Sequence, residues 1–270
     1  MKKLVCLILA LVMVLACGSA FAEADGSLDA IIGKGALVLG LDDAFPPMGF
    51  RDDDNNIVGY DIDVAAEVAA RLGVELVCQP IDWASKELEL DSGNIDCIWN
   101  GMSITPKRQA SMAMAIPYMN SAIVMVARDS EGFTSIADME GRIIGVQSGS
   151  FSEEVLETYE EYADFCASVE VAPYDEYLTA LLDLQQGGID GVLIDLVVAE
   201  YCIAGLGDDS FVIVDSLEDD LFGVGFRKDD LSLRDKVNDI LLEMAEDGTL
   251  AEISTKWFGS DISIVGKEGN

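Results

Sequence analysis

The sequence predicts an α/β protein with largely parallel sheets. Short apolar runs of strand length alternate with stretches whose apolar residues recur at helical spacing, a pattern typical of strands joined by crossover helices. The same strand and helix unit occurs in both halves of the chain. Hydrophobic residues make up 50% of the 270 residues, so the chain can build real cores in one large or two ordinary domains.

The elements of the first half begin with an apolar run at 36–41, which predicts a buried strand. The loop after it, residues 42–56, holds two prolines and a cluster of acids and amides, so we expect no regular structure there. A helix is predicted at 60–72, where apolar residues follow helical spacing and Gly73 marks the end. Further strands are expected at 74–78 and 95–99.

The second half opens with a strand expected at 142–146, followed by a small polar turn at 147–150 and a helix that begins near Phe151. The alternation continues to the end of the chain and no low-complexity segment interrupts it. It predicts helices at 177–186, 196–204 and 232–247, strands at 190–194, 211–214 and 222–226, and a shorter last helix that ends near Gly259.

The charge of the chain excludes several functions. It contains 50 Asp and Glu against 16 Lys and Arg, for a formal charge of −34, and no His. A body this acidic would repel a nucleic-acid backbone or an anionic membrane. Without imidazole the chain cannot form a Ser-His-Asp or Cys-His triad or an HExxH zinc site. No metal or cofactor motif is present either, so we expect no cofactor.

The N-terminus has the pattern of an export signal over residues 1–22. A short basic start precedes an apolar run at 4–16, which is too short to span a bilayer comfortably. Residues 14–17 resemble a bacterial lipobox in which Cys17 would be lipidated and become the new N-terminus. The alternative is small-x-small cleavage before Glu23. We therefore expect a protein anchored by lipid to the outer face of the cytoplasmic membrane, with a soluble periplasmic form as the alternative.

Four cysteines remain after the signal, with no CxxC and no spacing typical of a metal site. An exported protein can form disulfides, because its compartment is oxidising. However, Cys78 and Cys97 occur in predicted apolar strands, where cysteine is most often a small buried hydrophobe. We expect free thiols and leave a disulfide open. The four are Cys78, Cys97, Cys166 and Cys202.

Seven ordered blocks resemble the extracellular amino-acid-binding proteins of ABC importers, family 3 of the bacterial solute-binding proteins. The resemblance covers nearly all of the mature chain, from about Gly35 to Gly259. Any one block is weak, but all seven occur in order behind an export signal. The blocks are LVLGLDDAFPPMGF (37–50), VGYDIDVAAEVAARLGV (58–74), GNIDCIWNGMSITPKR (93–108), PYM (117–119), GRIIGVQSGS (141–150), LLDLQQGGIDGVLID (181–195) and DGTLAEISTKWFG (247–259).

The resemblance implies a two-lobed, periplasmic-binding-protein-like fold in which two α/β lobes are joined by two strands and the ligand is held in the cleft. By this analogy lobe 1 comprises residues 27–118 and 223–270, and lobe 2 comprises residues 123–218. The hinges then fall near 118–122 and 219–222. Closure of such a hinge around a ligand would create the surface that a membrane permease recognises.

A receptor for a free amino acid needs a planar cation, an anion and an apolar wall. Arg108, in TPKR, is the best candidate for the cation, because guanidinium binds carboxylate in a bidentate manner. Without the motif, a surface ion pair would be the ordinary explanation for this arginine. By resemblance, the carbonyl of Gly101 would accept from the ligand ammonium, and Ser103 would bond to main-chain groups of the ligand. In any other loop, both would be ordinary turn formers.

Three further candidates lie in the second half. Asp195 follows the apolar strand DGVLI, at the end where ligands of open α/β folds bind, and by resemblance it would pair with the ligand ammonium. A helix cap is its alternative role. Ser150 and Phe151 open a helix after a glycine turn, where amides and the positive end of the helix dipole favour an anion. They would therefore bind the carboxylate beside Arg108.

The wall for the ligand side chain would come from Phe45 and Trp83, which follow strands in acid-rich loops and align with aromatic positions of the family. Core or loop packing is their alternative. Gln147 aligns with a position that touches the ligand side chain in some relatives, although it could be a plain turn residue. Asp42 aligns with an acid of the family, and it could equally be a solvated loop charge like Asp43.

The expected function is the extracytoplasmic binding component of an ABC importer, a monomer that delivers a free L-amino acid to a permease. The acidic body disfavours glutamate and aspartate, so we expect a polar neutral or basic ligand. The basic choice is slightly disfavoured, because the sequence places no acid firmly at the far end of the pocket. Two alternatives are an exported enzyme similar to cyclohexadienyl dehydratase, with a carboxylate as general acid, and a sensor module.

Overall fold

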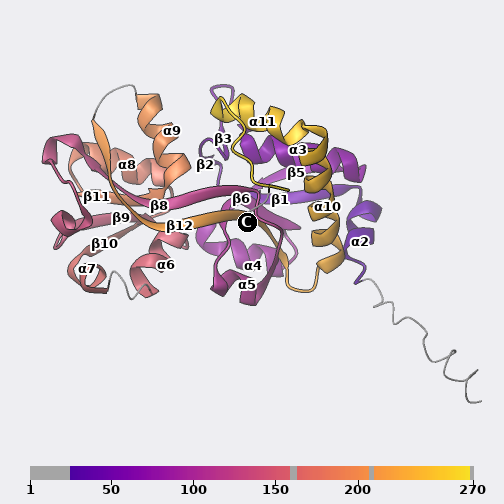
Figure 1. Cartoon of the computed structure of the whole chain (residues 1–270). Helices are drawn as coiled ribbons and strands as arrows, with labels where there is room; N and C mark the ends of the chain where they lie inside the picture. Colours follow the sequence, from indigo (N-terminus) through magenta and orange to yellow (C-terminus); the bar gives the residue numbers. More distant parts are fainter. Residues whose placement is uncertain (1–24, 159–162, 207–209, 268–270) are drawn as a thin grey trace, which may run out of the picture.

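A computed structural model describes residues 25–158, 163–206 and 210–267 of the chain. The predicted α/β class is confirmed. Figure 1 shows two lobes, each a set of strands flanked by helices, with two long strands running between them. The expected export signal, its lipobox and Cys17 lie outside the described residues.

Lobe 1 is built on three parallel strands in the order β6-β1-β5. They are β1 (Ala36–Leu41), β5 (Glu75–Pro80) and β6 (Cys97–Ser103). Leu37, Leu39 and Leu41 of β1 are completely buried, as expected for a strand covered on its faces by helices. The helices of this lobe are α2 (Ser27–Lys34), α3 (Tyr60–Leu72), α4 (Lys86–Asp91), α5 (Pro106–Ser111), α10 (Leu231–Asp247) and α11 (Thr249–Phe258), with the short strand β7 (Met112–Met114) and the 3₁₀ turn Trp83–Ser85.

Lobe 2 repeats the arrangement with parallel strands in the order β10-β9-β11. The strands are β9 (Ile143–Gln147), β10 (Glu170–Tyr174) and β11 (Gly191–Asp195). Its helices are α6 (Phe151–Thr158), α7 (Ala163–Ser168), α8 (Tyr177–Gln186) and α9 (Leu196–Leu206), with 3₁₀ turns at Asp129–Glu131 and Ile136–Met139.

Two antiparallel strands join the lobes into one nine-stranded sheet: β8 (Met119–Arg128) and β12 (Phe211–Arg227). The prediction of separate strands at 211–214 and 222–226 is wrong, because β12 is continuous. The segment between those two predicted strands is rich in polar residues, which does not indicate a strand. Its backbone nevertheless pairs with β8, with register shifts between Ile213 and Asp215 and between Ser216 and Glu218. Polar side chains are tolerated there because an antiparallel strand can expose one face to water.

The loop at 42–56 also differs from the expectation. It contains part of a three-stranded antiparallel sheet of β2 (Ala44–Phe45), β3 (Gly49–Arg51) and β4 (Ile57–Val58). The prolines do not prevent this, because Pro46 and Pro47 lie in the turn between β2 and β3 and donate nothing to the ladder. The small sheet holds Phe45 in a fixed position beside the end of β1.

The remaining predicted helices and strands are present as the predicted type of element. The predicted helices at 60–72 and 177–186 have the bounds of α3 and α8, and Gly73 ends α3 with a φ of 75°. The strands predicted at 74–78 and 95–99 begin one or two residues late, at Glu75 and Cys97. The four cysteines after the signal are free thiols, and Cys97 and Cys202 are buried. The pattern gave no signal for α2, α4, α5, α7, β8 or β10.

The polarity of the strands positions the site. Asp42 follows β1, Ser103 ends β6, Gln147 ends β9 and Asp195 ends β11. In both lobes these carboxyl ends face the space between the lobes. Because ligands of open parallel sheets bind beyond such ends, a ligand is expected in that space.

Candidate ligand-binding site

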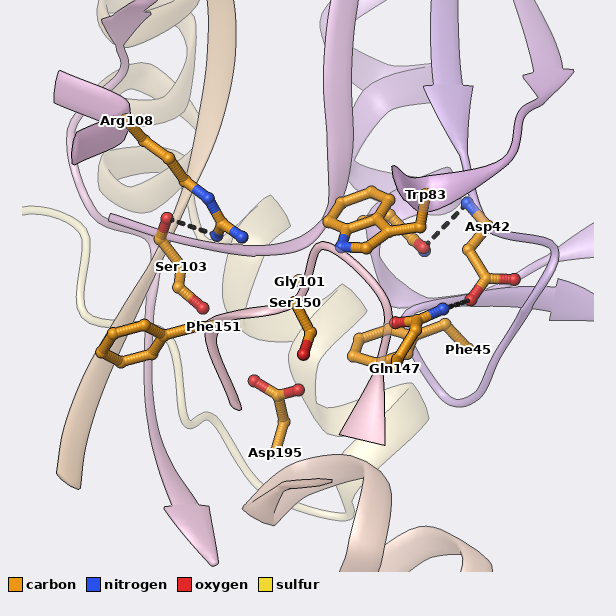
Figure 2. Close-up of a pocket in the computed structure, with 11 residues that line it drawn as sticks. Asp42, Phe45, Trp83, Gly101, Ser103, Arg108, Gln147, Ser150, Phe151 and Asp195 are labelled. Carbon is orange, nitrogen blue, oxygen red and sulfur yellow. Dashed lines mark hydrogen bonds between the residues drawn. The ribbon is translucent and has the colours of Figure 1, made fainter. Parts of the chain in front are cut away.

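One pocket between the lobes collects all ten residues singled out from the sequence (Figure 2). The space left between its lining side chains is only about 10 Å³, room for about one water molecule, so the two lobes are closed tightly on each other. The lining from lobe 1 is Asp42, Phe45, Trp83, Asn100, Gly101, Ser103 and Arg108, and the lining from lobe 2 is Gln147, Ser150, Phe151 and Asp195. Asn100 is the only lining residue that the sequence did not single out.

The floor of the pocket is the end of β6. Gly101 has a φ of 57°, and a Cβ there would lie 2.7 Å from the Phe45 ring, so only glycine fits. Its amide donates to Asp61 Oδ2 at 2.7 Å, and the Tyr118 hydroxyl donates to the same oxygen at 2.9 Å. Burial raises the pKa of Asp61 to about 7, against the effect of these donors. Asp61 thus ties the floor to the start of β8.

Arg108 provides the cation on α5. Thr105 caps this helix by accepting from the Arg108 amide at 3.3 Å. The guanidinium is buried; Nη1 donates to Ser103 O at 2.9 Å and Nη2 to Gly149 O at 3.3 Å. Burial lowers the pKa of Arg108, yet arginine stays charged in proteins. Since a guanidinium has five N–H donors, it retains donors for a ligand carboxylate.

Asp195 provides the anion at the end of β11, where Figure 2 shows its carboxylate pointing into the pocket. Burial raises the pKa of Asp195 well above its ordinary value; Asp220 raises it further, and Arg108 opposes the shift. A carboxylate that burial destabilises in this way gains from a cation brought by a ligand. Asp195 also directly precedes α9, so the capping position foreseen for it is compatible with a ligand role.

The turn at the start of α6 faces Arg108. The Ser150 hydroxyl caps the helix by accepting from the Glu153 amide at 3.1 Å. The Ser150 amide already donates to Gln147 O at 3.2 Å within the turn. A carboxylate bound here would share that amide, while the hydroxyl keeps a hydrogen to donate. Phe151 follows on α6 and closes this side of the pocket.

The opposite end of the pocket is closed by a contact between the lobes. Gln147 Nε2 donates to Asp42 Oδ2 at 2.7 Å (Figure 2). It also donates to Asp175 O at 2.9 Å. Asp42 is only 6% exposed, so its interpretation as a solvated loop charge is wrong. Asp43, by contrast, forms a partly exposed ion pair with Arg51. Burial raises the pKa of Asp42 to about 6, against the amide of Ala44 and the Gln147 side chain.

The aromatic wall is present at both predicted positions. Phe45 and Trp83 are buried and line the pocket. The Phe45 ring lies 5.9 Å from the Tyr177 ring of lobe 2, so the wall also forms part of the contact between the lobes. Tyr177 was not expected here.

Two further residues beside the site were missed. Asp220, on β12, is buried near Arg108, and burial raises its pKa to about 6, with Ser103 and Arg108 opposing the shift. It carried no signal because it falls in a run of acids. Lys86 lies one helical turn after Trp83 and is also buried. A lysine three residues after a wall aromatic was the available signal for it.

Fold and pocket together define a two-lobed solute-binding protein. The chain belongs to the bacterial extracellular solute-binding proteins, family 3, whose family model matches residues 37–260. The resemblance drawn from the seven sequence blocks is thereby confirmed, and so is the expected two-lobed fold.

Similar proteins of known name bind amino acids. The chain is 33% identical over 241 residues to the L-cystine-binding protein TcyJ of Escherichia coli (strain K12), covering 88% of both chains. It is 29% identical over 246 residues to the arginine-binding extracellular protein ArtP of Bacillus subtilis (strain 168), covering 90% of this chain and 91% of ArtP.

A solved structure is also close. An ABC uptake transporter substrate-binding protein from Streptococcus pneumoniae with bound histidine matches with a TM-score of 0.85 and 37% identity, over 90% of this chain and 99% of that one. These relatives are binding proteins, so the chain is a binding protein of the extracytoplasmic space and not an enzyme. In the part of the chain that the structure describes, no helix is both long and apolar enough to cross a membrane.

Proposed function

We propose that this protein captures one free L-amino acid between its lobes and delivers it to an ABC permease. The observation that carries the proposal is the convergence of the ten predicted residues, from both lobes, on one pocket. A cation, an anion and an aromatic wall at fixed separation match the carboxylate, ammonium and side chain of an amino acid.

The main-chain groups of the ligand would bind at the Arg108 end. Arg108 would hold the carboxylate together with Ser103 and the turn at Ser150 and Phe151. Asp195 would take the ammonium, with the Gly101 carbonyl as a second acceptor. Both ligand charges are then desolvated and paired, and this is the condition under which burial of charge is tolerated.

The ligand side chain would extend along Phe45 and Trp83 toward Asp42 and Gln147. Since the pKa of Asp42 is about 6, this end carries a carboxylate at neutral pH, which disfavours glutamate and aspartate. Asp42 is also a buried acid at the far end of the pocket. The sequence alone placed no acid there, and that lack was the argument against a basic ligand. A polar neutral or basic side chain therefore fits best, and the named relatives bind cystine, arginine and histidine.

A thermal-shift panel of the twenty amino acids with cystine and ornithine tests this ligand class. We expect the largest increase in melting temperature with a polar neutral or basic amino acid. A largest shift with glutamate, aspartate or an aliphatic amino acid would exclude it. Native mass spectrometry of protein purified without denaturation would identify any ligand that co-purifies.

Hinge closure is the mechanism we propose for capture by a monomer. Lobe 1 would be residues 27–118 and 223–270, lobe 2 residues 123–218, and the hinges 118–122 and 219–222. In support, β8 and β12 are paired along the segment that joins the lobes. Small-angle scattering should give a smaller radius of gyration at saturating ligand, and an unchanged profile would argue against the hinge.

We propose that the protein is located at the outer face of the cytoplasmic membrane, where lipidation of Cys17 anchors it. Metabolic labelling with a fatty acid should mark the wild-type protein, and Cys17→Ser should abolish the label. Recovery of a soluble mature protein that begins at Glu23 would favour the free periplasmic form instead.

A further inference from the structure

Lys86 is a buried lysine whose position the ligand contacts do not explain. It is the first residue of α4, its side chain is 2% exposed with the ammonium 3.4 Å from Glu87 Oε1, and it does not line the ligand pocket. Burial of an ammonium costs free energy unless hydrogen bonds compensate. Burial, reinforced by Arg108, lowers the pKa of Lys86 to about 8, so the group remains largely charged at neutral pH.

The hydrogen bonds of Lys86 join the two lobes. Nζ donates to Trp83 O in its own lobe at 3.1 Å and to Gly149 O in lobe 2 at 2.7 Å. It also lies 5.0 Å from the centre of the Trp83 ring. Both accepting carbonyls belong to the site, because Trp83 forms the wall and Gly149 precedes Ser150. The ammonium therefore links the wall to the lobe 2 turn without reaching the ligand pocket.

The lobe 2 side is shaped to receive this contact. Gly149 has a φ of 73°, and a Cβ on it would lie 3.0 Å from the Ala84 backbone and 3.2 Å from Lys86 Nζ. Its amide donates to Glu153 Oε2 at 2.7 Å, which fixes the turn from within lobe 2. Arg108 donates to the same Gly149 carbonyl. Two cations of lobe 1 thus converge on one carbonyl of lobe 2.

We infer that Lys86 is a positioning residue that latches the closed cleft through the Gly149 carbonyl and so slows ligand release. This inference rests on the proposed function, since it concerns closure around an amino acid. When the lobes separate, the Gly149 contact is lost and water can solvate the ammonium. The hydrogen bond therefore counts only in the closed state, and its loss affects ligand binding but not the fold of either lobe.

The test compares Lys86→Met with wild type in calorimetry and stopped-flow release, using the amino acid that gives the largest thermal shift. A hydrogen bond to a charged group predicts a dissociation constant raised roughly tenfold or more, mainly through faster release. Lys86→Met also removes the contacts to Trp83 O and Glu87 within lobe 1, so the melting temperature without ligand reports that loss. The latch is read from the release rate, which a merely structural lysine would leave unchanged.

The matched control is Lys107→Met. Lys107 is exposed and lies in a surface groove that Lys86, Arg108 and Gly149 also line. This variant therefore removes a similar charge without touching the Gly149 contact. We expect less than a twofold change in affinity. Equal losses in both variants would assign the effect to general charge and overturn the latch.

A second variant approaches the same contact from lobe 2 if Lys86→Met fails to fold. Gly149→Ala should separate the lobes at this point and accelerate release to a similar degree. Unchanged affinity and release rate in a folded Lys86→Met or Gly149→Ala protein would overturn the latch alone. A wild-type protein that binds no free amino acid would instead overturn the proposed function and this inference with it.

Discussion

The two lobes hold their sides of the pocket in different ways. In lobe 1, the Gly101 amide is fixed by Asp61, the Asp42 amide donates to Asn100 at 3.1 Å, and Arg108 is anchored on Ser103. In lobe 2, Gln147 and the Gly149 carbonyl bond across the cleft to lobe 1. On the proposed hinge opening, lobe 1 would therefore keep its half of the site, whereas the lobe 2 turn would lose partners.

This difference separates stability from affinity. Substitutions in the lobe 1 frame should reduce the free energy of unfolding as well as ligand binding. Substitutions in the lobe 2 turn should weaken ligand binding more than they lower the free energy of unfolding, because only part of their contacts, such as Gln147 to Asp175 O and the Gly149 amide to Glu153, lies within lobe 2.

The largest effect is expected where both lobes contact the ligand charges. Arg108→Ala or Asp195→Ala would leave a buried ligand charge unpaired, at a cost of about 2 to 5 kcal/mol. That corresponds to a dissociation constant raised roughly 30-fold to several thousand-fold. Calorimetry measures it, with Arg51→Ala, at the exposed end of β3, as the control for loss of an arginine outside the pocket. A loss below about fivefold for both would place the ligand elsewhere.

The lobe 1 frame is tested by Asp61→Ala. The change leaves the Gly101 amide and the Tyr118 hydroxyl buried without their acceptor, so the free energy of unfolding should fall by about 1 to 3 kcal/mol. Ligand affinity should fall too, because Gly101 loses its anchor. Denaturant unfolding and calorimetry give the two numbers, and Asp53→Ala, on the exposed loop, serves as control. Weaker binding at unchanged stability would contradict a preorganised lobe 1.

The pH dependence of the free energy of unfolding should reflect the ionisation of the Asp61 carboxyl. The pKa of Asp61 is raised from 3.8 to about 7, so between these values the folded state binds a proton that the unfolded state has released. The free energy of unfolding should then decrease as pH rises from about 4 to 7, by at most about 1.4 kcal/mol per pH unit for one proton. Asp42, Asp195 and Asp220, whose pKa values are also raised, add slopes of the same sign, so Asp61→Asn should reduce the slope by up to one proton and not abolish it. An unchanged slope would count against the assignment.

The smallest effect is expected in lobe 2. Gln147→Ala removes the hydrogen bond to Asp42 across the cleft, which contributes about 0.5 to 1.5 kcal/mol, or roughly a two- to tenfold change in affinity. The variant also loses the hydrogen bond to Asp175 O within lobe 2, so the melting temperature without ligand should fall by only about 2 to 4 °C. If it falls further, Gln147 mainly supports the fold of lobe 2 and the contrast between the lobes is lost.

Much of the site could be predicted from the sequence because several candidates end or follow an apolar strand, and the carboxyl ends of parallel strands converge. Asp42, Ser103, Gln147 and Asp195 all follow that rule. Lys86 and Asp220 escaped it because tertiary contacts, and not local pattern, bury them. The continuous β12 was missed for a related reason. Its polar centre is extended only because β8 pairs with it, and single-strand propensity does not report such pairing.

The path of β12 also sets the order in which the lobes can form during synthesis. Lobe 2 is one contiguous segment, but lobe 1 needs both ends of the chain. Ser27 of α2 contacts Ser232 of α10 with hydroxyl oxygens 2.9 Å apart, and Phe222 of β12 pairs with Ser103 of β6. The lobe 1 core therefore stays incomplete until the last helices have left the ribosome. For a protein that acts outside the cytoplasm, we expect this late closure to favour export of the chain before lobe 1 has folded.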